Sequence, residues 1–227
     1  MPFLEEAMMP FRAITLIALS LVAGHGDQAH ATAAVSVAAS IPSEWVIGPF
    51  IRGRNYSRGV PTQPTPRRGG GWYVDLPRAG GSVNYVTFRH GSLAGKRRIV
   101  MRYRIEMDPG VRIVPKTIPA LPSMITLYFQ RGGDNWTGRG PFETYRWYAT
   151  FATRSPITRG DHVLIAPLNA NWTAIQTSSA RTRPVAFREA LAGADQVGFV
   201  LGGGDGVGHG VYATGRARLV VTEFRVE

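Results

Sequence analysis

Cysteine is absent from this sequence of 227 residues, and lysine occurs only at Lys96 and Lys116. Without cysteine, the chain has no disulfide, no metal held by thiolates and no cysteine nucleophile. A fold without these supports depends on an apolar core, and hydrophobic residues make up 44% of the chain. Sequence signals of catalysis are missing too: there is no G-x-S-x-G elbow, and histidines 90, 162 and 209 lack the i, i+4 spacing of a zinc-binding helix. We therefore assign no catalytic residue from the sequence.

Long apolar runs are absent as well, except near the N-terminus. There, Arg12 precedes an apolar stretch over 13–23 that has the length of a signal peptide and is too short to span a membrane. Ala29-His30-Ala31 places small residues where a signal peptidase cuts, and Ala31-Thr32-Ala33 is an alternative. We therefore expect an exported protein, periplasmic or extracellular, without a transmembrane segment. Its predicted parts are a signal peptide over 1–31, a flexible lead-in over 32–43 and one domain over 44–227.

Acidic residues are few relative to basic ones, 15 against 26, so the net charge is +11. An excess of this size favours anionic partners such as acidic glycans or lipid headgroups. The basic residues are spread along the chain, whereas nucleic-acid-binding proteins cluster them. A GC-rich genome also produces arginine-rich proteins, so charge alone does not define a ligand. We expect a carbohydrate partner, with an anionic polysaccharide as one option, and no nucleic acid; the oligomeric state stays open.

Alternation of apolar and polar residues predicts strands with one buried face. In Ile99–Met107, the odd-numbered positions are apolar or aromatic and the even-numbered ones are mostly charged. The same period of two marks Ile125–Arg131 and Phe142–Phe151. Structure is expected to begin at 44–47, and further strands are expected at 72–76, 83–90, 162–167, 196–201 and 216–226. Only Pro184–Ala192 reads as a helix, since Phe187 and Leu191 share a face and Gly193 follows. This composition predicts an all-β fold: an antiparallel β-sandwich of the jelly-roll type with one short helix.

The C-terminal third carries a resemblance to a known group of domains. Asn171-Trp172-Thr173, then Phe187-Arg188-Glu189-Ala190-Leu191, then the apolar stretch Val197–Gly203 follow in this order, and an alternating closing strand ends the chain. This order resembles the galactose-binding-like jelly rolls of carbohydrate-binding modules and laminin-IV-like domains. Gly208-His209-Gly210-Val211-Tyr212 is similar to a stretch in exported bacterial proteins of this architecture. The resemblance implies the fold and carbohydrate binding, and it carries over no catalytic residue.

Candidate ligand-binding residues come from the polar faces of the middle strands and from one loop. If these strands are neighbours, their arginine, tyrosine and glutamine side chains align into a surface on which aromatic rings stack on sugars and planar polar groups bind hydroxyls. Arginine also suits a uronate carboxylate, because its two parallel donors match the two oxygens. The alternative is an ordinary solvated face with opposed charges. The candidates are Arg102, Arg104, Tyr128, Gln130, Arg146 and Tyr148, together with Trp136 in the loop 132–138, which either anchors a ligand or covers the sandwich edge.

Two other functions remain open at this stage. Arg104-Ile105-Glu106, with Tyr128, Tyr148 and Arg146, is similar to the Arg-x-Glu strand and catalytic tyrosine of jelly-roll polysaccharide lyases. The chain lacks the Gln-x-His and Tyr-Phe-Lys-x-Gly segments of those enzymes. The third function is that of a structural or adhesive protein of the cell envelope.

The glycine-rich run Gly202–Gly210 does not predict a nucleotide site. It contains no G-x-x-x-x-G-K-[ST] motif, and strand rather than helix is expected after it. Asp205 within this run leaves a structural calcium ion open, although no EF-hand spacing is present. No other cofactor is expected.

Overall fold

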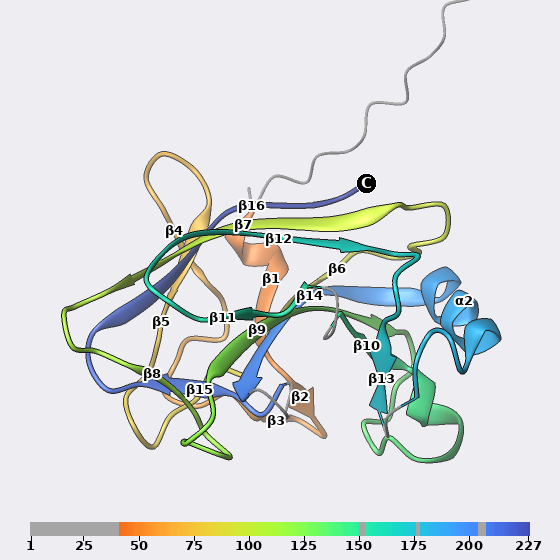
Figure 1. Cartoon of the computed structure of the whole chain (residues 1–227), viewed down its shortest axis with the longest axis horizontal. Helices are drawn as coiled ribbons and strands as arrows, with labels where there is room; N and C mark the ends of the chain where they lie inside the picture. The colour runs from red at the N-terminus through yellow and green to blue at the C-terminus, as the bar shows by residue number, and fades with distance from the viewer. Residues whose placement is uncertain (1–40, 150–152, 176–177, 204–207) are drawn as a thin grey trace, which may run out of the picture. The chain divides into compact units, whose positions relative to one another are not determined.

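A computed structural model describes residues 41–149, 153–175, 178–203 and 208–227. Two antiparallel sheets pack face to face (Figure 1). The seven-stranded sheet has the order β1 (Trp45–Gly48), β6 (Tyr85–Arg89), β14 (Ala194–Gly203), β9 (Ser123–Arg131), β10 (Arg146–Tyr148) and β13 (Thr173–Ala174), and β11 (Ser155–Pro156) also pairs with β9. The five-stranded sheet has the order β12 (Gly160–Pro167), β7 (Arg98–Met107), β16 (Ala217–Val226), β5 (Trp72–Asp75) and β4 (Thr65–Pro66).

The strand pairing is that of a jelly roll. In one sheet β5, β16, β7 and β12 lie side by side, and in the other β6, β14, β9 and β10 do. The first half of the chain therefore pairs with the second half in nested order: β5 with β16, β6 with β14, β7 with β12 and β9 with β10. Such a doubled-over hairpin rolled into two sheets is the jelly-roll architecture. The predicted fold class is confirmed.

Smaller elements close the ends of the sandwich. The helix α2 (Pro184–Ala192) lies at one end, and the ribbon of β8 (Ile113–Pro115) and β15 (Val211–Ala213) lies at the other (Figure 1). A second short ribbon joins β2 (Phe50–Ile51) to β3 (Arg54–Asn55). Two 3₁₀ turns, η1 (Pro42–Glu44) and η2 (Gly140–Thr144), precede β1 and β10. None of the helices in the described ranges is long and apolar enough to pass through a membrane.

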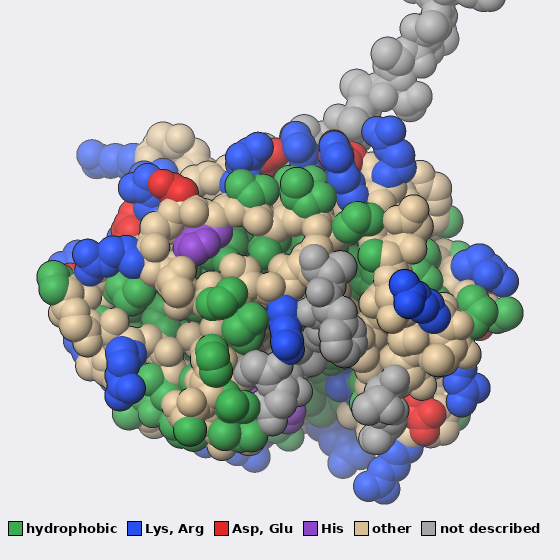
Figure 2. Space-filling view, in the orientation of Figure 1, with side chains coloured by type: hydrophobic (Ala, Val, Ile, Leu, Met, Phe, Trp, Pro, Cys, Tyr) green, Lys and Arg blue, Asp and Glu red, His purple; other side chains and the backbone are tan. Residues whose placement is uncertain are grey.

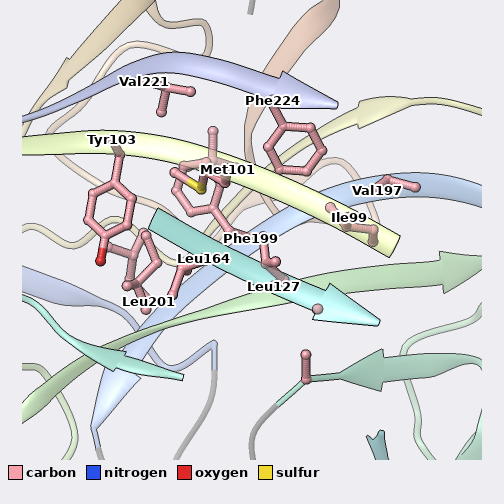
Figure 3. Packing of buried hydrophobic residues seen from close by; sticks show 14 of the residues in the cluster. Ile99, Met101, Tyr103, Leu127, Leu164, Val197, Phe199, Leu201, Val221 and Phe224 are labelled. Atoms are coloured by element: carbon pink, nitrogen blue, oxygen red, sulfur yellow. The ribbon is translucent and has the colours of Figure 1, made fainter. Parts of the chain in front are cut away.

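The core lies between the two sheets and explains the period of two in the sequence. Ile99, Met101 and Tyr103 of β7 face Phe199 and Leu201 of β14, as Figure 3 shows. All of them are buried, because successive side chains of a strand alternate between the two faces of the sheet. A bulge between Val221 and Glu223 shifts this alternation in β16, so that Phe224 rather than Glu223 points inward.

The elements predicted from the sequence are found with small changes. The helix has the predicted bounds, and the predicted core residues Trp72 and Trp172 are buried. One element is corrected: the strand expected over 142–151 begins as the turn η2, and the described strand there is only Arg146–Tyr148. Pro141 and the positive φ of Gly140 favour a turn over an extended strand at that point. The predicted signal peptide and most of the lead-in lie outside the described residues.

Candidate functional site

Three tyrosines form a buried cluster on the outer face of the seven-stranded sheet. The strand register places Tyr148 of β10 beside Tyr128 of β9, and both are close to Tyr85 of β6. The hydroxyls of Tyr85 and Tyr148 are 2.9 Å apart, and the Tyr128 hydroxyl donates a hydrogen bond of 2.9 Å to Oε1 of Gln130. Burial raises the pKa of all three hydroxyls above the ordinary value for tyrosine. The buried tyrosine cluster is therefore neutral at physiological pH.

An ion pair beside this cluster holds the loop 132–138. Asp134 accepts hydrogen bonds of 2.9 Å from Nε2 of Gln130 and from the backbone N–H of Trp136. Its Oδ2 also lies 2.8 Å from Nε of Arg146, as an ion pair without the alignment of a hydrogen bond. The side chain of Asp134 is 0% exposed and that of Arg146 is 11% exposed, so the two charges face each other away from water. Pairing of this kind is what makes buried charges tolerable.

The ion pair and the cluster together position Trp136. The Arg146 guanidinium lies 4.7 Å from the centre of the Trp136 ring, and the Tyr85 ring meets it edge-on at 5.5 Å. Trp136 has a φ of 66°, in the left-handed region. A residue other than glycine pays about 1–3 kcal/mol there and keeps this conformation only where its surroundings impose it. Trp136 is thus a partly exposed ring held in one orientation.

A cavity of about 860 Å³ opens beside Trp136, over β1 and β6. One part of its lining is aromatic and comes from Trp136, Tyr85 and Phe50. Another part is polar and comes from Thr87 and Arg89 on the outer face of β6, with Gln196 of β14 paired next to Arg89. Beyond β6 the lining includes His90, Ser92 and Lys96, and Glu44, which precedes β1, also lines the cavity. An open cavity with aromatic rings and several convergent polar groups is the usual form of a small-ligand site.

The structure divides the residues that the sequence nominated between two opposite surfaces. It brings together Tyr128, Gln130, Trp136, Arg146 and Tyr148, as described above. It places Arg102 and Arg104 on the other sheet, because β7 pairs with β12 and β16 and not with β9. The expected alignment of all three polar strand faces is therefore wrong: β9 and β10 are neighbours, and β7 belongs to the second layer.

The outer face of the five-stranded sheet is a solvated, charge-balanced surface. Arg102 pairs with Glu223 at 2.9 Å, Arg104 with Asp161 at 2.6 Å, and Arg218 with Asp75 at 2.7 Å. Basic and acidic side chains lie together over β7 and β16 in Figure 2. Cross-strand charge pairs of this kind explain the alternating sequence of β7 without any ligand.

Five of the residues predicted from the sequence lie together. Four of them pack behind Trp136 and do not line the cavity. Tyr128, Gln130 and Tyr148 are buried, and only Trp136 also borders the cavity. Sequence reasoning missed Phe50, Tyr85, Arg89 and Lys96. The signal for two of them was present, since Tyr85, Thr87 and Arg89 alternate with apolar residues in the predicted strand 83–90, the same criterion that selected Tyr128 and Gln130.

Metal-binding groups do not gather in the described part of the chain, where no cluster of three or more histidine, aspartate and glutamate side chains occurs. Asp205, the residue considered for calcium, lies outside the described residues.

No known family model matches the chain, and no curated protein matches its sequence. The site must be interpreted from its own geometry.

Proposed function

We propose that this protein binds a carbohydrate, without cleaving it, in the cavity beside Trp136. The observation that carries the proposal is the fixed orientation of the Trp136 ring at the wall of an 860 Å³ cavity. Sugars present apolar C–H faces that stack on aromatic rings, and a ring that is already oriented loses little conformational entropy on binding. Phe50 is 46% exposed and lines the same cavity, so its ring is a second surface for stacking.

The polar lining supports the same ligand class. Thr87, Gln196 and Arg89 supply hydroxyl, amide and guanidinium groups along one stretch of the outer sheet face. Such side chains are common partners of sugar hydroxyls. The amide and the guanidinium present their hydrogen-bonding groups in one plane, and the threonine hydroxyl both donates and accepts. Thr87 donates a hydrogen bond of 3.3 Å to Oε1 of Gln196. A purely apolar ligand would still shield the Arg89 guanidinium and the remaining polar atoms of this pair from water, which costs free energy.

The two tyrosines that suggested a lyase, Tyr128 and Tyr148, favour binding over elimination chemistry, because neither of them lines the cavity. A polysaccharide lyase needs a tyrosine or histidine that exchanges protons with the sugar. Burial raises the pKa of Tyr128 and Tyr148 well above the ordinary value, so their hydroxyls stay protonated. The Arg104-Ile105-Glu106 segment, which suggested a lyase, lies on the opposite sheet and pairs there with Asp161. The adhesive alternative lacks a comparable observation, because the arginine-rich face of β7 is neutralised by its own acidic residues.

A glycan-array screen tests the proposal. We expect the purified protein to bind one class of glycan, and we expect Trp136→Ala and Phe50→Ala to weaken that binding. Phe50 is exposed, so its replacement keeps the fold if Trp136→Ala disturbs it. Arg104→Ala on the opposite sheet is the matched control and should bind like the wild type.

Two results of the same screen would refute the proposal. If no glycan binds, or if both aromatic variants bind as well as the wild type, carbohydrate binding in this cavity is refuted. An increase in ultraviolet absorbance from unsaturated products during incubation with uronate polymers would instead establish a lyase.

A further inference from the structure

The cavity has a cationic part as well as an aromatic one. Along the outer face of β6, Tyr85, Thr87 and Arg89 follow each other at alternate positions, so Tyr85 and Arg89 stand about 13 Å apart. Tyr85 contacts Trp136, whereas Arg89 is followed by His90 and then by Lys96 in the loop that leads to β7. A short oligosaccharide that stacks on Trp136 therefore extends along β6 toward these basic groups.

The basic groups of the cavity differ from the arginines of the opposite sheet. Over the ranges that the structure describes, neither Arg89 nor Lys96 forms an ion pair, while Arg102, Arg104 and Arg218 all do. Glu44 is the acidic residue that lines the same cavity, so two permanent positive charges stand against one negative charge. The local excess is positive and has no partner within the described fold.

His90 adds a titratable group at this end. The ring is half-buried, meets Phe88 edge-on, and has its Nδ1 3.3 Å from the Gly91 carbonyl oxygen. If Nδ1 donates this hydrogen bond, Nε2 remains as the second polar atom of the ring. The charged groups that line the cavity with His90 are Lys96, Arg89 and Glu44. The negative charge of Glu227 is taken up by ion pairs with Arg98 and Arg225.

We infer that the ligand is a carboxylated oligosaccharide of the uronic-acid class, whose carboxylate is bound by Arg89 and Lys96 while a sugar ring stacks on Trp136. This inference rests on the proposed function and adds the charge of the ligand to it. Arginine binds a carboxylate through two parallel donors, and lysine adds a mobile point charge. The spacing along β6 separates the two subsites, so one ligand reaches both.

Two probes with the same sugar chain test the inference: trigalacturonic acid, which is charged, and its trimethyl ester, which is neutral and carries a methyl group on each carboxyl. We expect the wild type to bind the acid at least about tenfold more tightly than the ester, the difference that one charge-assisted hydrogen bond supplies. Arg89→Gln and Lys96→Gln should each reduce this ratio severalfold, because each removes one of the two positive charges that the carboxylate contacts. Lys116→Gln is the matched control, because Lys116 is the other lysine of the chain and lies outside the cavity.

A second readout locates the carboxylate directly. A carbodiimide joins a carboxylate to a nearby lysine amine with loss of water, and the chain has lysine only at 96 and 116. We expect trigalacturonic acid to be coupled to Lys96 and not to Lys116, as read by peptide mass spectrometry. Excess trimethyl ester should suppress the coupling, because it competes for the Trp136 subsite.

The outcomes separate the two proposals. If the acid and the ester bind equally well and Trp136→Ala abolishes both, the cavity binds neutral sugars and the carboxylate inference is overturned. If Trp136→Ala leaves the binding of both probes unchanged, the proposed function fails as well. Coupling in equal amounts at Lys96 and Lys116 would also overturn the inference.

Discussion

Replacing Asp134 by asparagine tests the support beneath the site most sharply. Asparagine keeps the size of the side chain and removes its charge. Arg146 then keeps its positive charge with a side chain only 11% exposed, and its nearest anion is gone. In the altered protein, the loop 132–138 also loses a charged acceptor for the Trp136 N–H.

The magnitude follows from the burial of both partners. Removing one partner of a buried ion pair costs about 3–5 kcal/mol, because the other charge stays away from water. An exposed pair is much weaker, since water and salt screen it. Asp161→Asn removes the exposed partner of Arg104 and serves as the control, for which we expect no resolvable change.

The assay is urea-induced unfolding followed by tryptophan fluorescence. A loss of about 3–5 kcal/mol should appear as a lower midpoint with an unchanged slope. Because Trp136 loses its fixed orientation, glycan binding should weaken in Asp134→Asn below the midpoint as well. If Asp134→Asn and Asp161→Asn unfold at the same urea concentration and bind alike, the buried ion pair neither stabilises the fold nor positions Trp136.

Three further predictions concern pH and packing. Stability should fall above about pH 10, by about 1.4 kcal/mol per pH unit for each tyrosine of the buried cluster, because their raised pKa values keep them protonated in the folded state while the unfolded state ionises; tyrosinate absorbance that accounts for all eight tyrosines of the chain well before unfolding would contradict this. Burial and the nearby Lys96 lower the pKa of His90. As the pH falls through that pKa, the ring gains a positive charge, so the affinity for the anionic trigalacturonic acid should rise. His90→Gln should remove this dependence, as measured by calorimetry between pH 7 and 5. Phe187→Ala should destabilise the domain by about 3–5 kcal/mol, since its ring packs on Phe129 and Trp147, whereas Val185→Ala on the exposed side of α2 should have little effect in thermal unfolding.

The class of fold could be predicted from local patterns. Alternation in 99–107 and 125–131 specified strands with one buried face, because the period of a strand forces neighbouring side chains to opposite sides. The helix over Pro184–Ala192 followed from its early proline, its apolar spacing and Gly193 at its end. These are short-range effects, and each acts within a few residues.

The site could be predicted only in part, because alternation does not say which sheet a strand joins. The sequence of β7 suggested the same role as that of β9, yet pairing placed Arg104 on the charge-balanced face and Tyr128 in the buried cluster. Contacts between distant segments decide this, such as Tyr85 against Tyr148 and Trp136. No local pattern revealed that Asp134 would lie buried against Arg146, or that Lys96 would border the same cavity as Phe50.

The sequence by itself determined that this chain builds a sandwich around an apolar core without disulfides, because alternating side chains require a buried sheet face and, without cysteine, no disulfide can replace that core. The tertiary structure alone decided which polar side chains share a surface. Nested pairing of the two halves of the chain joined β6, β14, β9 and β10 into one sheet and sent β7 to the other. The physical reason is that hydrogen-bonded pairing between strands links segments far apart in sequence, and a ligand site is a property of that pairing.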